Sequence, residues 1–311
     1  MSNSRPDFLK MIRAPFLSSI IFPLSTGSLL SFYVTGIIDV PNLLLVFIMG
    51  ICLHIATNVY NDIYDTLQGT DRINANRNEF SGGSGVLVDF PDLLPVMYRI
   101  ARCSLIGALI AAVLLLARIH DSLQIVLVLL FLFSVFFSKF YTAAPIKLAY
   151  RGLGEFFVWL AFGPMAVLVA AVSQNVGLHK IVMIAMPIPG ISTLSILLIG
   201  QMIDVEADKA TGKWGVAVRL GNKATSYVYL FVQIFLCMDV MVLSLFCLRD
   251  GWILLMSLIP YVFLMPKVFQ ILVVDYDHSE PLKKGARMNV LLHLVFSLLF
   301  IVSLTIILAL Q

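Results

Sequence analysis

Two acidic segments of this sequence carry side chains whose types and spacing could bind a divalent cation. The first contains Asn61, Asp62 and Asp65, and the second contains Asp204 and Asp208. Residues three or four positions apart lie on the same face of a helix, so each segment would present its oxygens along one stripe. Carboxylates one turn apart repel each other, whereas Mg²⁺ accepts one or two carboxylates together with phosphates and water. The two stripes therefore predict Mg²⁺ ions that hold a diphosphate between them.

Both stripes extend toward the middle of the helices that would carry them. His54 and Asn58 precede the first acidic group at helical spacing, and Gln201 precedes Asp204 by one turn. An acidic side chain costs up to about 3.5 kcal/mol at the centre of a membrane helix. A single acid at a helix end could simply be hydrated, but two clusters of matching form favour a polar cavity that binds a cation. The sequence contains no Cys/His spacing typical of zinc and no Walker A loop.

The elements that must position these stripes are membrane helices. The chain is 60% hydrophobic and 13% charged, and the charged fraction is about half that of a typical soluble domain. A membrane span needs roughly 20 apolar residues, and nine segments qualify: about 14–32, 43–61, 94–117, 122–141, 153–173, 181–203, 224–247, 252–274 and 288–310. The first is long for a signal peptide and has no clear small-residue cleavage site, so we interpret it as a retained helix. We expect an all-α integral membrane protein in which nine transmembrane helices surround a central cavity, with residues 1–311 forming a single polytopic domain.

The basic residues predict the orientation of these helices. If the helices alternate in direction, 18 of the 21 Lys and Arg residues fall on one side and only Arg118, Lys180 and Arg249 fall on the other. Short cytoplasmic loops carry the excess of positive charge, so the N-terminus and both acidic clusters are expected to face the cytoplasm. The net charge of +3 follows from this bias, and we expect no nucleic-acid partner.

Further polar residues at the same predicted membrane face could hold diphosphate oxygens. These candidates are Arg13, Asn58, Arg72, Lys139, Tyr141 and Lys147. The basic ones could equally be ordinary anchors on the positive side of the membrane. Asp239 and His293 lie in the middle of predicted spans, where ionisable residues are functional candidates by position alone.

The acidic segments resemble the two aspartate motifs of the UbiA superfamily of intramembrane prenyltransferases. Residues 58–71 resemble its NDxxD motif, and residues 204–221 resemble its second motif. Three further segments resemble the branch of 1,4-dihydroxy-2-naphthoate polyprenyltransferases in menaquinone biosynthesis: FSGGSGVL at 80–87, YTAAPIK at 141–147 and YRGLGE at 150–155. The chain differs from that branch just before the second motif, where Gly200 and Gln201 stand in place of an Asn.

The resemblance implies a prenyltransferase domain in the cytoplasmic membrane with Mg²⁺ as cofactor. Its partners would be a polyprenyl diphosphate, a dihydroxynaphthoate-like aromatic acceptor and the lipid bilayer. The residues matching the family's metal motifs are Asn61, Asp62, Asp65, Asp204 and Asp208, and the four aspartates would be catalytic. Gln201 is our candidate for contact with the aromatic acceptor. Three alternatives stay open: transfer to another aromatic, a terpene cyclase built on the same scaffold, and a secondary transporter.

Overall fold

The computed structural model describes residues 5–78 and 83–311. Phe80, Ser81 and Gly82 of the segment at 80–87 lie outside the described residues. In the part of the chain that is described, helices long and apolar enough to cross a membrane number nine. These are Ala14–Thr35, Val40–Gln68, Pro91–Leu116, Asp121–Phe140, Gly154–Ser173, Lys180–Ala210, Asn222–Cys247, Gly251–Val274 and Ser279–Ala309. The prediction of an all-α membrane protein with nine spans is confirmed.

Several of these spans are built from more than one helical element. The elements of the first half are α1 Phe8–Met11, η1 Ala14–Leu17, α2 Ser18–Thr35, α3 Val40–Gln68, α4 Thr70–Ile73, α5 Val86–Asp89, η2 Pro91–Leu93, α6 Leu94–Leu116, α7 Asp121–Phe140 and η3 Leu148–Arg151. Those of the second half are α8 Gly154–Leu160, η4 Ala161–Met165, α9 Ala166–Ser173, α10 Lys180–Ala185, α11 Pro187–Ala210, α12 Val216–Leu220, α13 Asn222–Val242, η5 Leu243–Cys247, η6 Gly251–Leu258, α14 Ile259–Phe263, α15 Met265–Val274 and α16 Ser279–Ala309.

Prolines and glycines explain where these spans change their helical form. Pro164 lies inside η4, a π-helical turn between α8 and α9, because proline cannot donate the backbone hydrogen bond that a regular helix needs. Gly163 in the same turn faces Gly190 of α11, and a Cβ on either residue would collide with the other helix. The two helices approach closely here, as small residues permit in membrane proteins.

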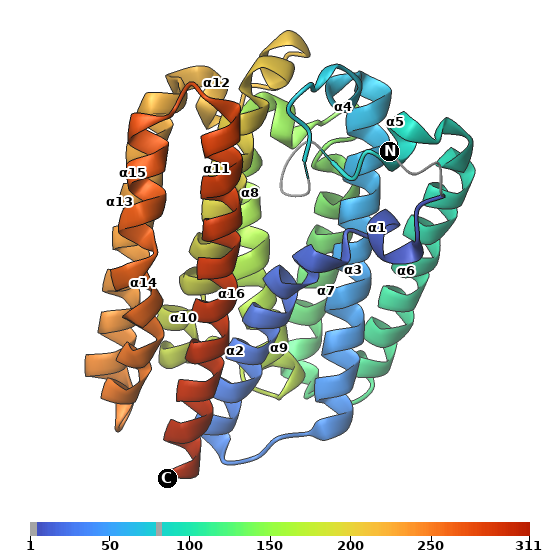
Figure 1. Cartoon of the computed structure of the whole chain (residues 1–311). Coiled ribbons are helices and arrows are strands. Elements are labelled where there is room, and N and C mark those ends of the chain that lie inside the picture. Colours follow the sequence, from blue (N-terminus) through green and yellow to red (C-terminus); the bar gives the residue numbers. More distant parts are fainter. Residues whose placement is uncertain (1–4, 79–82) are drawn as a thin grey trace.

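The helices pack into two groups, and α2 and α9 of the first group also contact the second. One apolar core joins α2, α3, α6, α7 and α9, and another joins α11, α13, α15 and α16. A third core, which includes Phe22 and Phe296, links α2 to α11, α13 and α16. Gly27 of α2 packs directly against the backbone oxygen of Val167 in α9. Figure 1 shows the resulting bundle, with the N-terminal helices on one side and the C-terminal helices on the other.

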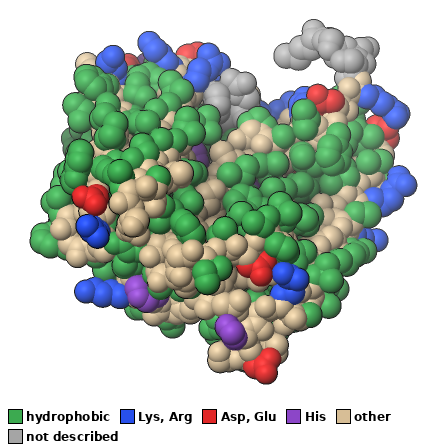
Figure 2. Space-filling view, turned by 90° about the horizontal axis from the view of Figure 1, so that it is seen from below, with side chains coloured by type: hydrophobic (Ala, Val, Ile, Leu, Met, Phe, Trp, Pro, Cys, Tyr) green, Lys and Arg blue, Asp and Glu red, His purple; other side chains and the backbone are tan. Residues whose placement is uncertain are grey.

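The connections after α3, α7 and α11 meet at one end of the bundle. The side-chain amide of Gln68 donates a hydrogen bond to the carbonyl of Thr142 at 2.9 Å, and the backbone N–H of Trp214 donates to the carbonyl of Tyr150 at 3.1 Å. In Figure 1 this is the upper end, which carries α4, α5 and α12. Figure 2 views the molecule from below and shows most of the visible Lys and Arg side chains around the rim, with few on the face itself. The prediction that both acidic clusters lie at one end is confirmed.

Candidate active site

The first acidic stripe lies on the last turns of α3. Asn58, Asp62 and Asp65 are buried, with 9%, 2% and 4% of their surfaces exposed. Asn61 and Asp65 line a cavity inside the bundle. α3 ends at Gly69, whose φ of 95° is a left-handed conformation that glycine adopts without steric cost. The stripe therefore reaches the last turn of the helix, where the chain can turn back over it.

The segment that turns back adds a third carboxylate to this stripe. Asp71 on α4 is 3% exposed and lines the same cavity. The backbone N–H of Ser84 donates a hydrogen bond to Oδ1 of Asp62 at 3.1 Å. Gly83 has a φ of 70°, and a Cβ there would collide with the carboxylate of Asp71. Burial, and then the neighbouring carboxylates, raise the pKa of Asp71 to about 8.

The second stripe lies at the end of α11 and is joined to the first. Asp204 and Asp208 both line the cavity, and Asp208 is 2% exposed. The side-chain amide of Asn74, which follows α4, donates a hydrogen bond to Oδ1 of Asp204 at 2.7 Å. The hydroxyls of Thr70 and Thr211 are hydrogen-bonded at 2.9 Å. The loop after α3 thus holds the two stripes together.

Lys213 lies between the two stripes. Its Nζ is 3.1 Å from Oδ2 of Asp65 and 3.7 Å from Oδ1 of Asp208. Tyr150 donates a hydrogen bond from its hydroxyl to Oδ1 of Asp65 at 2.7 Å. Burial alone would lower the pKa of Lys213, but the carboxylates of Asp208 and Asp65 raise it well above its usual value. The charged ammonium of Lys213 therefore lies between the carboxylates of the first stripe and those of the second.

Two of the predicted diphosphate ligands, besides Asn58, line the cavity at this end. Nη1 of Arg13 is 3.6 Å from Oδ1 of Asp62, and its guanidinium lies 4.7 Å from the ring centroid of Phe16. Arg13 has a φ of 54°, an uncommon conformation for a residue with a side chain. Tyr141 also lines the cavity, and burial raises the pKa of its phenol. Both side chains are positioned to contact an anion beside the carboxylates.

The other three predicted diphosphate ligands lie outside the cavity lining. Arg72 and Lys139 are exposed at the surface, and Nζ of Lys139 lies 5.5 Å from the ring centroid of Phe140. Nζ of Lys147 lies 5.2 Å from the ring centroid of Tyr150, and Lys147 is not among the residues that line the cavity. The structure therefore separates these three cations from Arg13, although all share one end of the bundle.

Gln201 lines the cavity and is held by a residue that the sequence interpretation did not include. Its Nε2 donates a hydrogen bond to Oε1 of Glu155 at 2.8 Å, and the backbone N–H of Val216 donates to the same oxygen at 2.7 Å. The amide packs against Gly215, where a Cβ would collide with it. Oε1 of Gln201 is enclosed and has no hydrogen-bond partner among the described residues. Glu155 thus fixes the orientation of the amide, with its nitrogen toward the carboxylate.

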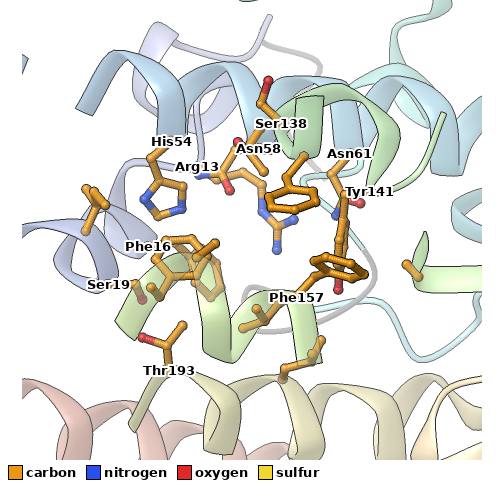
Figure 3. A pocket seen from close by; sticks show the side chains of 18 of the residues that line it. Arg13, Phe16, Ser19, His54, Asn58, Asn61, Ser138, Tyr141, Phe157 and Thr193 are labelled. Carbon is orange, nitrogen blue, oxygen red and sulfur yellow. The ribbon is translucent and has the colours of Figure 1, made fainter. Parts of the chain in front are cut away.

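The cavity continues from this polar end into an apolar region between α2, α3, α7, α9 and α11. Its apolar walls include Leu24, Met49, Phe131, Phe137, Phe162, Val169 and Leu197. Figure 3 shows the labelled side chains of Arg13, His54 and Asn58 directed into the cavity from one side, with Phe157 opposite. A ligand with a charged head and a long hydrocarbon tail would match this change in polarity.

Oxygens at the polar end suit a magnesium-bound anion. Oδ1 of Asn61 and Oδ2 of Asp62 are enclosed without a hydrogen-bond partner in the part of the chain that is described, and buried oxygens of this kind require a partner. Within those same residues, no three His, Cys, Asp or Glu side chains form a compact metal cluster. The carboxylate and amide oxygens of the two stripes fit Mg²⁺, which binds oxygen ligands and completes its coordination with phosphate and water.

Three residues of the site escaped the sequence interpretation, although each lies in a segment that it singled out. Asp71 and Lys213 follow the two acidic stripes by a few residues, and Glu155 ends the YRGLGE segment. Their charge and their place beside the motifs were the available signals. Helical spacing could not find them, because the chain leaves the helix before it reaches Asp71 or Lys213.

The described residues form a bundle of nine candidate membrane spans with acidic stripes at the head of an apolar cavity, which defines an integral membrane protein, and comparisons with known proteins specify its family. The model of the UbiA prenyltransferase family matches residues 96–292, more than half of the chain. The chain therefore belongs to the UbiA prenyltransferase family, and it is a multi-pass membrane prenyltransferase. The recognition of this superfamily from the acidic motifs is confirmed.

Curated relatives are distant but cover most of the chain. The 2-carboxy-1,4-naphthoquinone phytyltransferase of Synechocystis is 26% identical over 225 residues, covering 72% of this chain and 69% of that protein. The UbiA prenyltransferase domain-containing protein 1 of Dictyostelium discoideum is 29% identical, covering 79% and 72%. The 1,4-dihydroxy-2-naphthoate octaprenyltransferase of Bacillus subtilis is 27% identical, covering 69% and 66%.

Solved structures share the fold. A UbiA homologue from Archaeoglobus fulgidus is 14% identical and superimposes with a TM-score of 0.65, covering 97% of this chain and 99% of that one. A structure of a homologue from the same organism, bound to DMAPP and Mg²⁺, gives a TM-score of 0.58 at 12% identity, covering 98% and 100%. At these identities the likeness shows the fold alone.

Proposed function

We propose that this prenyltransferase, whose family transfers prenyl groups to aromatic acceptors, joins a polyprenyl group to 1,4-dihydroxy-2-naphthoate with loss of CO₂. The observation that carries the proposal is the meeting of two carboxylate stripes at the head of an apolar cavity. The naphthoate acceptor is supported by the relatives named for naphthoate or naphthoquinone prenylation. Prenyl transfer to another aromatic and terpene cyclisation remain the alternatives to be tested.

Mg²⁺ would be held at the two acidic stripes. The proposed ligands are Asn61, Asp62, Asp65, Asp204 and Asp208, and the position of Asp71 makes it a further candidate. When bound, Mg²⁺ neutralises negative charge on a departing diphosphate, which lowers the barrier to breaking the allylic C–O bond. Because Lys213 contacts both stripes, its ammonium would lie close to a diphosphate bound between them and would give the leaving group a second source of positive charge.

The remaining head-group contacts follow from the cavity lining. Arg13, Asn58 and Tyr141 would bind diphosphate oxygens from the α3 and α7 sides. Arg72, Lys139 and Lys147, predicted in the same role, would act through the general positive potential at this end, because they lie outside the lining. The apolar walls would hold the prenyl chain and exclude water, so that the allylic carbon meets the acceptor rather than water.

Gln201 would contact the aromatic acceptor. Because Glu155 only accepts hydrogen bonds when ionised, the amide nitrogen of Gln201 is committed to it, and the amide oxygen is left for a ligand that donates. A hydroxyl of the dihydroxynaphthoate is such a donor. A site that hydrogen-bonds a hydroxyl strongly rejects analogues that lack it.

We further propose that the polar end of the bundle faces the cytoplasm from the cytoplasmic membrane. The support is the positive-inside rule, since 18 of 21 basic residues fall at this end of the predicted topology. Residues 1–311 would act as one catalytic unit, because the cavity draws residues from α2 through α11 and α16 packs against both α2 and α11.

One assay tests the function. Purified protein in detergent is incubated with Mg²⁺, a labelled polyprenyl diphosphate and 1,4-dihydroxy-2-naphthoate, and the products are separated by mass. We expect a prenylated, decarboxylated naphthol whose formation stops when EDTA is added. A preference for 4-hydroxybenzoate would reject the naphthoate assignment, and a hydrocarbon product formed at full rate without any aromatic would favour the cyclase.

A further inference from the structure

His54 is a buried base for which the diphosphate chemistry has no use. It is 5% exposed and lines the cavity. Its Nδ1 is enclosed and has no hydrogen-bond partner among the described residues, and the ring packs edge-on against Phe162 with centroids 4.8 Å apart. Buried polar groups nearly always have a partner. A ring nitrogen left without one, on a side chain that lines a cavity, points to a ligand that supplies it.

The position of His54 places it below the diphosphate end. It precedes Asp62 by eight residues on α3, which corresponds to about 12 Å along the helix axis. Asn58 lies between them on the same face, and Figure 3 shows the His54 ring directed into the cavity beside Phe16. An extended diphosphate would occupy the first part of that distance. The allylic carbon and the ring that attacks it would then lie level with His54.

Few other groups on the cavity wall could accept a proton there. The titratable residues in the described lining are Arg13, His54, Asp65, Asp71, Tyr141, Asp204, Asp208 and Lys213. The carboxylates gather at the metal end, Arg13 and Lys213 are cations, and Tyr141 is a phenol at the level of the carboxylates. Within this set, His54 is the neutral base that lies toward the apolar part of the cavity.

We propose that His54 is the general base that takes the hydroxyl proton of the aromatic acceptor as the new carbon–carbon bond forms. This inference rests on the proposed function. The O–H electron pair becomes a C=O π bond, the displaced ring π pair forms the bond to the allylic carbon, and the C–O pair of the prenyl diphosphate leaves on the diphosphate. The proton moves to the imidazole. When CO₂ then departs, its bonding pair restores the ring and the carbonyl oxygen recovers the proton from His54.

This balance of electrons restricts the chemical class of acceptor. The hydroxyl must be conjugated with the carbon that is attacked, as in a 1-naphthol attacked at carbon 2. An acceptor whose hydroxyl is methylated has no proton to give, so it should bind the cavity without reacting. An acceptor with a more acidic hydroxyl needs less help from the base.

The test compares His54→Gln with His293→Gln. His293 is also a buried histidine of a membrane span, at 1% exposure, but it contacts Ser192 and does not line the cavity. Single-turnover rates are measured with labelled prenyl diphosphate, Mg²⁺ and a series of 1-naphthols of graded hydroxyl acidity. We expect His54→Gln to slow bond formation by about 100-fold or more, with unchanged prenyl diphosphate affinity and a penalty that shrinks as the hydroxyl becomes more acidic. His293→Gln should show no such trend.

A loss for His54→Gln of less than about threefold, or an equal loss with every naphthol, would overturn the proposal, because a packing residue has no reason to follow hydroxyl acidity. If His54→Gln does not fold, the wild-type protein still tests the proposal. Prenylation of a naphthol with a methylated hydroxyl at the normal rate by the wild-type protein would overturn the proposal. Failure of the proposed function is distinguishable, since the wild-type protein would then give no prenylated product with any of these naphthols.

Discussion

The unusual carboxyl group of Asp71 gives the prediction that follows most directly from the structure. Asp71 is 3% exposed and stands beside the carboxylates of Asp62 and Asp65, so its pKa is raised from 3.8 to about 8. Asp71→Asn replaces the carboxyl with a neutral group of the same shape. Without a divalent cation, this substitution should therefore stabilise the protein at neutral pH, although it removes a residue of the proposed active site.

The sign follows from proton linkage. Between pH 4 and pH 8 the folded protein holds a proton on Asp71 that the unfolded chain has lost, so this group's contribution to stability is complete below its unfolded pKa and is lost as the pH rises through about 8. At pH 7 the solution is about three pH units above the usual pKa of 3.8, so keeping Asp71 protonated in the folded protein costs about 4 kcal/mol at 1.36 kcal/mol per unit. Since relaxation of the site reduces this value, we expect a gain of about 2–4 kcal/mol, or roughly 4–8 °C in Tm.

Thermal unfolding in detergent with EDTA, between pH 5 and pH 8, measures this difference. The gap between Asp71→Asn and wild type should widen as the pH rises, and Mg²⁺ with a prenyl diphosphate should stabilise the wild type more than the variant. Asp92→Asn is the control, because Asp92 is exposed at the same end and pairs only with an exposed Arg5 in the described part of the chain. A gap that does not change with pH, or a variant less stable than wild type at pH 8, would refute the reasoning.

Three further predictions concern the proposed active site. Alanine at each of the four aspartates of the two stripes should remove most turnover and abolish stabilisation by Mg²⁺ with prenyl diphosphate, and full activity in any two of these variants would show that the metal lies elsewhere. Arg13→Ala should raise the KM for prenyl diphosphate by about tenfold, the equivalent of 1.4 kcal/mol, whereas Lys147→Ala should change it less because Lys147 lies outside the cavity lining; equal effects would contradict the geometry. Gln201→Ala should raise the KM for the aromatic acceptor and spare diphosphate binding, and Glu155→Gln should do the same more weakly because it frees the Gln201 amide to turn; an unchanged acceptor KM in both would exclude this contact.

Much of the fold could be predicted because the membrane restricts the secondary structures that a chain can form within it. Backbone polar groups in hydrocarbon must be satisfied within a helix, so long apolar segments indicate spans directly, and each of the nine spans in the described residues overlaps a predicted one. The helices Val40–Gln68 and Lys180–Ala210 continue beyond their predicted ends at 61 and 203 and so carry the acidic stripes, and Ser279–Ala309 begins before its predicted start at 288. Acids such as Asp65 and Asp208 stood out because they lie at the ends of apolar helices, where only a cavity accommodates them. Their shared end also followed from the even number of spans between them.

Only the tertiary structure decided which of the polar residues at that end meet. Arg13 and Lys147 looked equivalent as cations near the membrane face, but the turn before η1 directs Arg13 toward Asp62 while Lys147 lies over Tyr150. Lys213 reaches the site from a loop, whose path depends on contacts with other helices rather than on local periodicity. Glu155 reaches it from the first turn of α8, whose position beside α11 depends on helix packing.

The sequence by itself thus determined that the protein lies in a membrane, how many spans it has and where its two acidic stripes lie. These features depend on composition and on spacing within single helices. The structure decided the pairing of side chains from different segments: the contact of Lys213 with both stripes and the support of Gln201 by Glu155. It also left Nδ1 of His54 without a hydrogen-bond partner among the described residues. Such pairings depend on how closely helices approach, which here is governed by contacts such as Gly27 against Val167 and Gly163 against Gly190. Close approach is a property of two surfaces together, and no single segment of sequence encodes it.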